Sequence, residues 1–180
     1  MIERLLQKHI EKNLFQGKVI ILYGARRVGK TTLSKQLLSN YESQGKSTAY
    51  FNCESLKVRG RIETTDETKL YDFFKTYNLV VLDEAQSIEN IGLILKILHD
   101  SHPEIQIIAT GSSSFDIANK LGEPLVGRAR TFTLYPFAIG ELKYDLFKLD
   151  SNLENFLKYG LYPAVITSDD RVEELQDIVN

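Results

Sequence analysis

The chain has 180 residues, of which 43% are hydrophobic and 26% charged, and its 22 basic and 24 acidic side chains give a formal net charge of −2. This balance indicates one globular domain with a substantial core, and it argues against a general nucleic-acid coat while leaving room for a local basic face. No apolar run is long enough to span a bilayer, charged residues at positions 3 and 4 interrupt any signal-peptide core, and the single cysteine, Cys53, excludes an internal disulfide. We therefore expect a cytoplasmic protein.

Apolar periodicity predicts helices and strands that alternate along the chain. In chain order we expect a helix at 2–13, a strand at 18–23, a helix up to about residue 40, a strand at 47–52, an irregular polar stretch at 53–63, a helix at 65–76, a strand at 79–82, a helix between Ser87 and His102, a strand at 105–110, a polar turn at 111–114, a short helix at 114–120 and a strand at 130–134. Thr64 and Glu67 have the spacing of a capping box, and Ser87 is suited to cap the helix that follows it.

The alternation of strands and helices predicts an α/β fold with a mainly parallel sheet of about five strands and helices on both faces. Ligands of such sheets bind outside the carboxyl ends of the strands. The loops that follow Tyr23, Asp83 and Thr110 are therefore expected to meet at one edge of the sheet.

One stretch between a predicted strand and a predicted helix fits the pattern G-x-x-x-x-G-K-[ST] without a mismatch. It consists of Gly24, Ala25, Arg26, Arg27, Val28, Gly29, Lys30 and Thr31, and Thr32 follows it. Its backbone N–H groups and the start of the next helix would bind a phosphate chain, and the two glycines allow the close approach. A chance glycine-rich turn is the alternative, which the flanking strand and helix disfavour.

Within this phosphate loop, the residue types assign separate roles. Lys30 would bridge the β- and γ-phosphates, Thr31 would offer its hydroxyl to Mg²⁺, and Thr32 would pack against or support the loop. The backbone does the binding, so Arg26 and Arg27 are expected to point outward, where one of them could contact a partner or the rest of the chain.

Two acidic residues follow the apolar run at 79–82. Asp83 at the tip of a buried strand would hold Mg²⁺ together with Thr31, directly or through water. Glu84 would accept a proton from, or orient, the water that attacks the γ-phosphate. The alternative is that both residues simply cap the next helix.

Further polar residues fall where the same edge is expected. Thr110, Ser112 and Ser113 could sense the γ-phosphate or hold the attacking water, and a serine-rich turn with local hydrogen bonds fits them equally well. Arg128 could contact its own nucleotide or act as an arginine finger toward a neighbouring subunit, whereas Arg130 reads more simply as a surface residue beside an edge strand.

Taken together, these pieces resemble the prokaryotic AAA-type ATPases that join a P-loop domain to a C-terminal domain of uncharacterised function. The matching stretches are Ile21–Leu33, Val80–Gln86, Ala109–Ser113, Gly127–Arg128 and Leu134–Phe137. The phosphate loop alone would indicate only a P-loop NTPase, but the ordered set is much more specific.

The resemblance implies ATP as nucleotide, Mg²⁺ as cofactor, the strand order 5-1-4-3-2, and a sensor role for Ser112 or Thr110. The character of the sequence changes after Pro136, so we expect a P-loop ATPase core with an N-terminal helix at 1–136 and a helical extension at 137–180, which begins with a helix at 137–149 and leads into a C-terminal domain beyond this sequence. The implied partners are that domain or another protein, with a homo-oligomer and nucleic acid left open and no membrane.

Three functions remain open from the sequence. The first is a Mg²⁺-dependent ATPase whose hydrolysis drives a conformational change or assembly, with Lys30, Glu84, Ser112 and Arg128 as catalytic residues. The second is a nucleotide-gated interaction module with little turnover. The third is a small-molecule kinase in which Arg128 and Arg130 lie on a lid over the phosphates.

Overall fold

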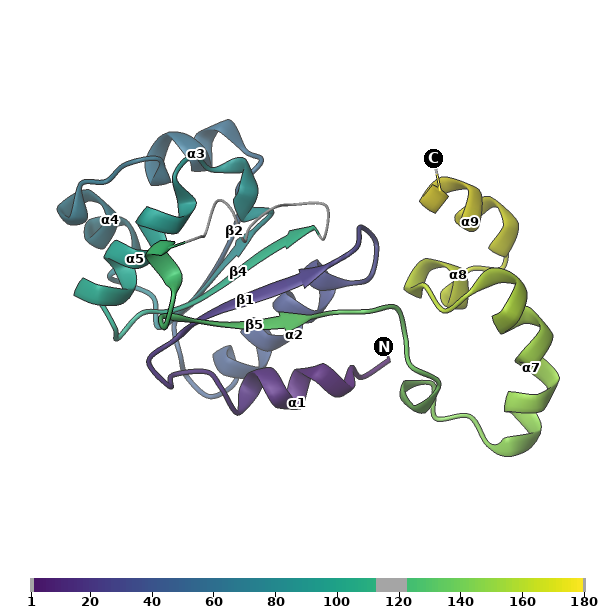
Figure 1. Ribbon diagram of the computed structural model, residues 1–180. Coiled ribbons are helices and arrows are strands. Elements are labelled where there is room, and N and C mark those ends of the chain that lie inside the picture. The colour runs from purple at the N-terminus through teal and green to yellow at the C-terminus, as the bar shows by residue number, and fades with distance from the viewer. Residues whose placement is uncertain (1, 113–122, 180) are drawn as a thin grey trace.

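A five-stranded parallel sheet with the order β2-β3-β4-β1-β5 organises the computed structural model, which describes residues 2–112 and 123–179 (Figure 1). The strands are β1 (Val19–Gly24), β2 (Thr48–Asn52), β3 (Leu79–Asp83), β4 (Gln106–Ser112) and β5 (Ala129–Thr133). This order, read from the other edge, is the 5-1-4-3-2 order that the resemblance implied, so the predicted fold class is confirmed.

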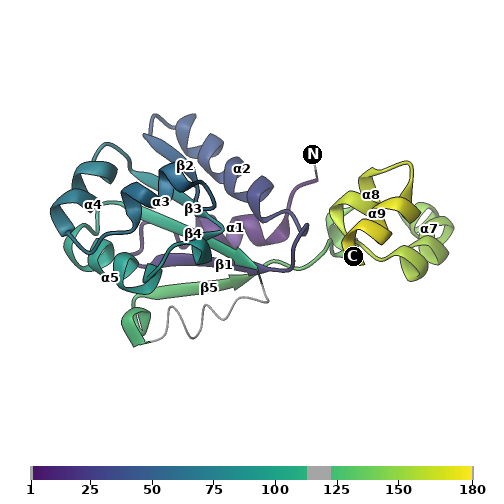
Figure 2. The ribbon, with the colours of Figure 1, turned by 90° about the horizontal axis from the view of Figure 1, so that it is seen from above.

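Helices cover both faces of the sheet (Figure 2). The covering helices are α1 (Leu5–Glu11), α2 (Lys30–Glu42), α3 (Leu56–Ile62), α4 (Glu67–Phe74) and α5 (Ile91–Ser101). Farther along the chain follow α7 (Leu146–Tyr159), α8 (Pro163–Thr167) and α9 (Arg171–Val179). Val80 and Leu82 of β3 pack into the hydrophobic cluster of α3, α4 and α5, whereas Val81, between them, packs with α1 and α2. Because alternate strand residues face opposite sides, a continuous apolar run is what a doubly covered strand requires.

The residues at 53–63, expected to be irregular, contain helix α3. Of its seven residues only Ile62 is buried, and Lys57, Arg59 and Arg61 interrupt its apolar pattern. The helix therefore lacks the apolar stripe from which periodicity identifies a helix.

Two helix starts also differ from expectation. Asp66, not Thr64, caps α4 by accepting a hydrogen bond of 3.3 Å from the Lys69 N–H. Residues Ala85–Ser87 form a 3₁₀ turn, and α5 begins after Asn90, which adopts the left-handed conformation with φ 52°. Each helix therefore begins a few residues after the predicted cap, α4 at the Asp66 side chain and α5 at the left-handed Asn90.

The ends of the two remaining segments differ as well. Strand β4 continues through Gly111 and Ser112, where a turn was expected, because both residues pair with the end of β1. After Pro136 the chain makes a 3₁₀ turn at Ile139–Glu141, and the expected helix begins only at Leu146. The helix expected at 114–120 lies outside the described residues.

Helices α7, α8 and α9 lie beyond the carboxyl ends of the strands, close to the N-terminal segment (Figures 1 and 2). The boundary between a core at 1–136 and an extension at 137–180 stays a prediction. Within the two described ranges, none of the helices is long and apolar enough to cross a membrane.

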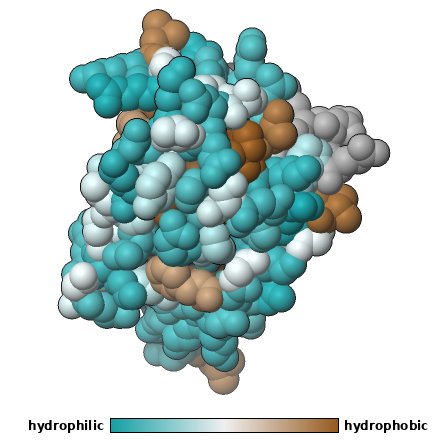
Figure 3. All heavy atoms as spheres, turned by 90° about the vertical axis from the view of Figure 1, so that its left-hand side faces the viewer, coloured by the Kyte–Doolittle hydropathy of each residue, from teal (hydrophilic) through white to brown (hydrophobic). Residues whose placement is uncertain are grey.

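The opposite side of the molecule, formed by α3, α4 and α5, is mostly hydrophilic with separate apolar spots (Figure 3). The exposed apolar side chains of these helices include Leu56, Tyr71 and Leu93. Single exposed apolar residues are ordinary on a protein surface and mark no particular site.

Candidate functional site

The loop between β1 and α2 has the backbone that a phosphate loop requires. Gly29, at the N-cap of α2, has φ 97°, a conformation that a residue with a side chain rarely adopts. At Gly24 a Cβ would collide with the backbone carbonyl of Leu134 and come within 2.9 Å of Val28 Cγ2. Both glycines are therefore needed, one for backbone conformation and the other for close packing.

Lys30 folds back over this loop. Its Nζ donates hydrogen bonds to the carbonyls of Gly24 and Ala25, at 2.9 and 3.0 Å, and the residue is only 5% exposed. Burial lowers the pKa of Lys30, while the charges of Glu84 and Asp83 act in the opposite direction. A buried ammonium whose present acceptors are neutral carbonyls would gain strongly from an anion.

The Asp83 carboxylate, at the end of β3, accepts hydrogen bonds from three hydroxyls. Thr31 Oγ1 donates to Oδ2 at 2.7 Å, the Tyr50 hydroxyl donates to the same oxygen, and Thr110 Oγ1 donates to Oδ1. Asp83 is 4% exposed, so these bonds replace most of its hydration. The structure thus brings Thr31 and Asp83 together, as the sequence predicted, and adds Tyr50 and Thr110 to them.

Glu84 sits directly after this carboxylate in a strained backbone conformation. Its φ is 53° and ψ is 46°, in the left-handed region that non-glycine residues seldom occupy. Its N–H donates to Thr110 Oγ1 at 3.2 Å, and its carboxylate accepts a hydrogen bond from Gln86 Nε2. Strain of this kind is concentrated at functional sites, and the capping role considered from sequence is not what Glu84 performs through its side chain.

Ser112 lies beside the phosphate loop because it pairs with Gly24 where β4 runs next to β1. It is 6% exposed. Ser113, the other sensor candidate, lies outside the described residues.

Arg128 lies at the opposite edge of the sheet. Its carbonyl accepts from the Val19 N–H at 2.9 Å, at the amino ends of β1 and β5, and its Nε donates to Asp100 Oδ1 at 2.7 Å. That pairing, together with the hydrogen bond between Asp100 and the His99 ring, lowers the pKa of Asp100 to about 2. The expectation that Arg128 contacts the nucleotide of its own chain is therefore wrong, since the residue precedes a parallel strand whose other end faces the site. A contact with a neighbouring subunit stays a hypothesis.

The two arginines of the loop are exposed, as expected, while Val28 beside them is buried. Arg27 Nη1 lies 3.7 Å from Asp177 Oδ2 of α9, and both side chains are about half exposed, at 46% and 63%. Such a pair contributes little stability, but it places α9 next to the phosphate loop.

Arg4 is a site residue that the sequence reasoning missed. Its Nη1 donates to the Val28 carbonyl at 2.9 Å, its Nη2 donates to the Tyr135 carbonyl, and its Nε lies 3.2 Å from Glu141 Oε1. Arg4 is 7% exposed and Glu141 is 6% exposed. An arginine just before the first helix carries no local signal for this role, because all of these partners are distant from it in sequence.

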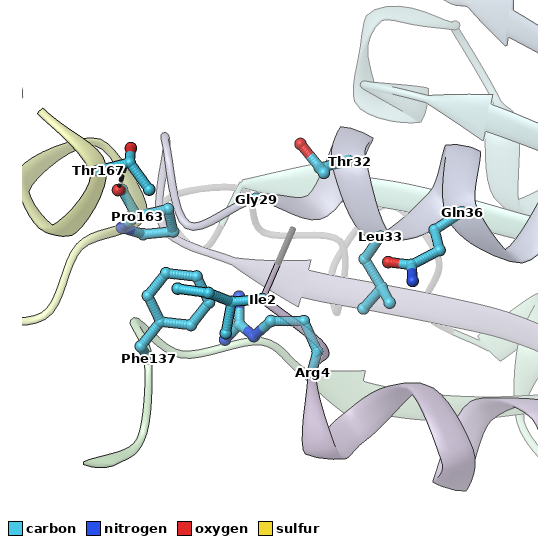
Figure 4. Close-up of a pocket in the computed structure, with 9 residues that line it drawn as sticks. All are labelled: Ile2, Arg4, Gly29, Thr32, Leu33, Gln36, Phe137, Pro163 and Thr167. Atoms are coloured by element: carbon cyan, nitrogen blue, oxygen red, sulfur yellow. Dashed lines mark hydrogen bonds between the residues drawn. The ribbon is translucent and has the colours of Figure 1, made fainter. Parts of the chain in front are cut away.

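A cavity of about 240 Å³ opens beside the phosphate loop (Figure 4). Its walls come from the N-terminal segment, the start of α2, the chain after β5, and α8; they are Ile2, Arg4, Gly29, Thr32, Leu33, Gln36, Phe137, Pro163 and Thr167. The lining is mixed, with four apolar side chains and with polar groups from arginine, threonine and glutamine. The cavity is thus contiguous with the loop and suited to a flat apolar ring that carries a few polar atoms.

A family model described as AAA domain matches residues 16–143. The chain belongs to this AAA domain family. No curated protein matches the chain. The AAA domain assignment agrees with the resemblance inferred from the phosphate loop, Asp83 and Glu84.

Solved structures share the fold of this AAA domain at low sequence identity. A replication initiator DnaA bound to AMPPCP and single-stranded DNA matches with a TM-score of 0.55 and 18% identity, over 97% of this chain and 54% of that one. The ORC1 protein of Aeropyrum pernix in complex with DNA gives 0.55 and 15%, over 83% and 48%. The Pif1 helicase of Candida albicans gives 0.55 and 16%, over 97% and 47%. The chain spans about half the length of these proteins.

Proposed function

We propose that this AAA domain binds ATP with Mg²⁺ and hydrolyses it to ADP and phosphate, and that hydrolysis drives a conformational or assembly change. The observation that carries the proposal is the hydrogen bond from Thr31 to Asp83 beside the buried Lys30. It joins the first turn after the phosphate loop to the carboxylate at the tip of β3, the combination that phosphoryl transfer uses.

The phosphate chain would lie against the loop of residues 24–29 and the N-terminus of α2. Free N–H groups and the helix dipole favour an anion there. Lys30 would exchange its two carbonyl acceptors for phosphate oxygens, which supplies a charge-assisted interaction in a buried setting.

The base would occupy the cavity between Ile2, Phe137 and Pro163 (Figure 4). The volume of about 240 Å³ is below the range of roughly 300–1,000 Å³ typical of drug-sized ligands, so it suits one ring system rather than a larger molecule. The polar groups of Thr32 and Gln36 on the same wall would meet the polar edge of a purine.

The oxygen donors Thr31 and Asp83 suit Mg²⁺, which prefers carboxylate, hydroxyl and water oxygens. When bound, the cation would neutralise charge on the β- and γ-phosphates. Glu84 would orient the attacking water and accept its hydrogen bond. Its Oε2 accepts a hydrogen bond from Gln86, and the carboxylate keeps further acceptor sites for the water.

The test is nucleotide binding and phosphate release measured on the same samples of wild type, Lys30→Ala, Glu84→Gln and Glu89→Gln. We expect Lys30→Ala to weaken binding, and Glu84→Gln to bind normally but release phosphate at least about a hundredfold more slowly. Glu89 is an exposed glutamate five residues further on and serves as the matched control, with unchanged turnover. Phosphate release by Glu84→Gln at the wild-type rate would refute the role of Glu84.

A nucleotide-gated module with little turnover is the second candidate. Two contacts favour it. The hydrogen bond between Glu84 and Gln86 holds the side chain that hydrolysis would use, and the contact of Arg27 with α9 would transmit the state of the phosphate loop to the helical extension. Tight binding without turnover in the same assay would select it. The kinase hypothesis required Arg128 and Arg130 on a lid over the phosphates, but both residues lie at the amino end of β5, away from the phosphate loop.

Partners are also a matter of proposal. The DnaA and ORC1 structures are complexes with DNA. We propose that this chain acts on its own C-terminal domain or on another protein. Binding of nucleic acid is tested by adding single- or double-stranded DNA, and self-association by measuring the molecular mass with and without nucleotide.

A further inference from the structure

Tyr50 of β2 places its hydroxyl on the Asp83 carboxylate, although nothing in the motif of the phosphate loop calls for a tyrosine there. We propose that Tyr50 is a positioning residue, which orients Asp83 so that Asp83 and Thr31 present oxygen atoms to a divalent cation. This inference rests on the proposed function, because it concerns the cation that accompanies the nucleotide.

The geometry shows how the two oxygens of Asp83 are divided. Oδ1 is bonded to Thr110 of β4, whereas Oδ2 is shared by Thr31 of α2 and Tyr50 of β2. Strand β2 neighbours β3, and Asn52 pairs with Asp83 in the register. Tyr50 is two residues before Asn52 and so lies on the same face of β2, from which its long side chain reaches the carboxylate.

Holding Asp83 also fixes Thr31. A hydroxyl has one proton and two acceptor lone pairs. Thr31 donates its proton to Asp83 at 2.7 Å, so its lone pairs stay available to a cation. If Oδ2 of Asp83 turned away, Thr31 would lose this orientation, and Tyr50 is the second hydroxyl that keeps Oδ2 in place.

Tyr50 is itself held in a defined position. The Lys35 ammonium lies 4.8 Å from the centroid of its ring, one helical turn beyond Thr31 on α2. The ring also packs against the hydrophobic cluster beneath α2. A stiff aromatic side chain anchored at both its ring and its hydroxyl is well suited to orient a carboxylate, and phenylalanine would keep the contacts of the ring without the hydroxyl.

The test is Tyr50→Phe, which removes a single oxygen atom. Binding of a fluorescent ATP analogue is measured in EDTA and then across a Mg²⁺ titration, with thermal unfolding of the free protein as the check on folding. We expect affinity in EDTA to stay within about twofold of wild type, while the Mg²⁺ concentration that half-maximally tightens binding rises about three- to tenfold, the range of a typical net hydrogen bond.

Tyr41→Phe is the matched control, since Tyr41 lies near the far end of α2, ten residues from Thr31. Its Mg²⁺ requirement should equal that of wild type. A role confined to packing would change the unfolding temperature or the affinity in EDTA without shifting the Mg²⁺ titration.

An unchanged or lowered Mg²⁺ requirement in Tyr50→Phe would overturn the proposal, and a lowered one would mean that the tyrosine hydroxyl keeps the cation from Asp83. If the phenylalanine variant does not fold, Tyr50→His is compared with Tyr50→Leu. Only histidine carries a side-chain donor, an N–H in place of the O–H, so an equal Mg²⁺ requirement of these two would also refute the inference. Wild type that binds no nucleotide would refute the proposed function and this inference together, whereas wild type that binds Mg²⁺–nucleotide separates them.

Discussion

The carboxylate of Glu141 joins the chain after β5 to the N-terminal segment, and replacing it with glutamine should destabilise the whole domain. Its Oε1 accepts from Arg4 Nε at 3.2 Å and from the Leu5 N–H at 2.7 Å, and its Oε2 accepts from the Ala138 N–H at 2.9 Å. Glutamine has one acceptor oxygen and one donor group, so its NH₂ group would face at least one of these three donors.

The magnitude follows from burial. The side chains of Arg4 and Glu141 are only 8% and 5% exposed, so water does not screen the loss. Leaving a buried guanidinium without its counter-charge typically costs about 3–5 kcal/mol. For a chain of this size about 1 kcal/mol lowers the melting temperature by about 2–4 °C, so Glu141→Gln should melt about 6–20 °C below wild type.

Thermal and urea unfolding measure this effect, with Glu3→Gln as control. Glu3 also pairs with lysines, Lys8 and Lys143, both at 3.5 Å, but it is 44% exposed and water screens these pairs, so its replacement should change the melting temperature little. A decrease in Glu141→Gln as small as that of the control would refute the reasoning.

A double variant, Arg4→Met with Glu141→Leu, separates a simple ion pair from a hydrogen-bonding hub. A simple buried pair is often replaced by apolar residues without loss. Here the carbonyls of Val28 and Tyr135 and the N–H groups of Leu5 and Ala138 would all lose partners, so we expect no recovery. Wild-type stability in the double variant would contradict the hub.

Two further predictions concern parts of the fold distant from the phosphate loop. Arg128→Ala should leave nucleotide affinity in dilute solution within about twofold of wild type, a smaller change than the loss of a direct contact would cause. In an NMR titration of this variant, the pKa of Asp100 should rise from about 2 toward its ordinary value. Because the pKa of Asp100 is lowered by folding, the stabilisation from its pair with Arg128 is present at neutral pH. The stability difference between wild type and Arg128→Ala should therefore shrink as the pH falls from about 4 to about 2. Gly60→Ala should raise the free energy of unfolding by about 0.5–1 kcal/mol and so raise the urea midpoint, because Gly60 lies within α3 and a Cβ added there would meet open space. An unchanged or lower midpoint would contradict the helix at this position.

The sheet and the phosphate loop could be predicted because their signals are local. The run of apolar residues in β3 ends at Asp83, and the motif of the loop stands directly between β1 and α2. Parallel strands bring their carboxyl ends to one edge, so the meeting of Thr31 with Asp83 follows from topology. The strand order came from the resemblance and not from the periodicity.

Arg4, Tyr50 and Arg128 show where sequence reasoning failed, for one physical reason. Each depends on contacts across the chain: Arg4 with Glu141, Tyr50 with Asp83, and Arg128 with Asp100. The charge and shape of an arginine suit a phosphate wherever it lies, but only its strand position decides which edge of the sheet it faces.

The contacts of Arg4 give the loop and the helical extension a common support. The Val28 carbonyl, at the back of the phosphate loop, and the Tyr135 carbonyl, after β5, accept hydrogen bonds from one guanidinium. Across a trans peptide the carbonyl of Val28 and the N–H of Gly29 point in opposite directions, so fixing the one orients the other. A rotation of this peptide would therefore break a bond to the same group that anchors Glu141 and the chain leading to α7. The position of the extension and the orientation of the Gly29 N–H, which we propose binds phosphate, cannot change independently while Arg4 keeps all of its bonds.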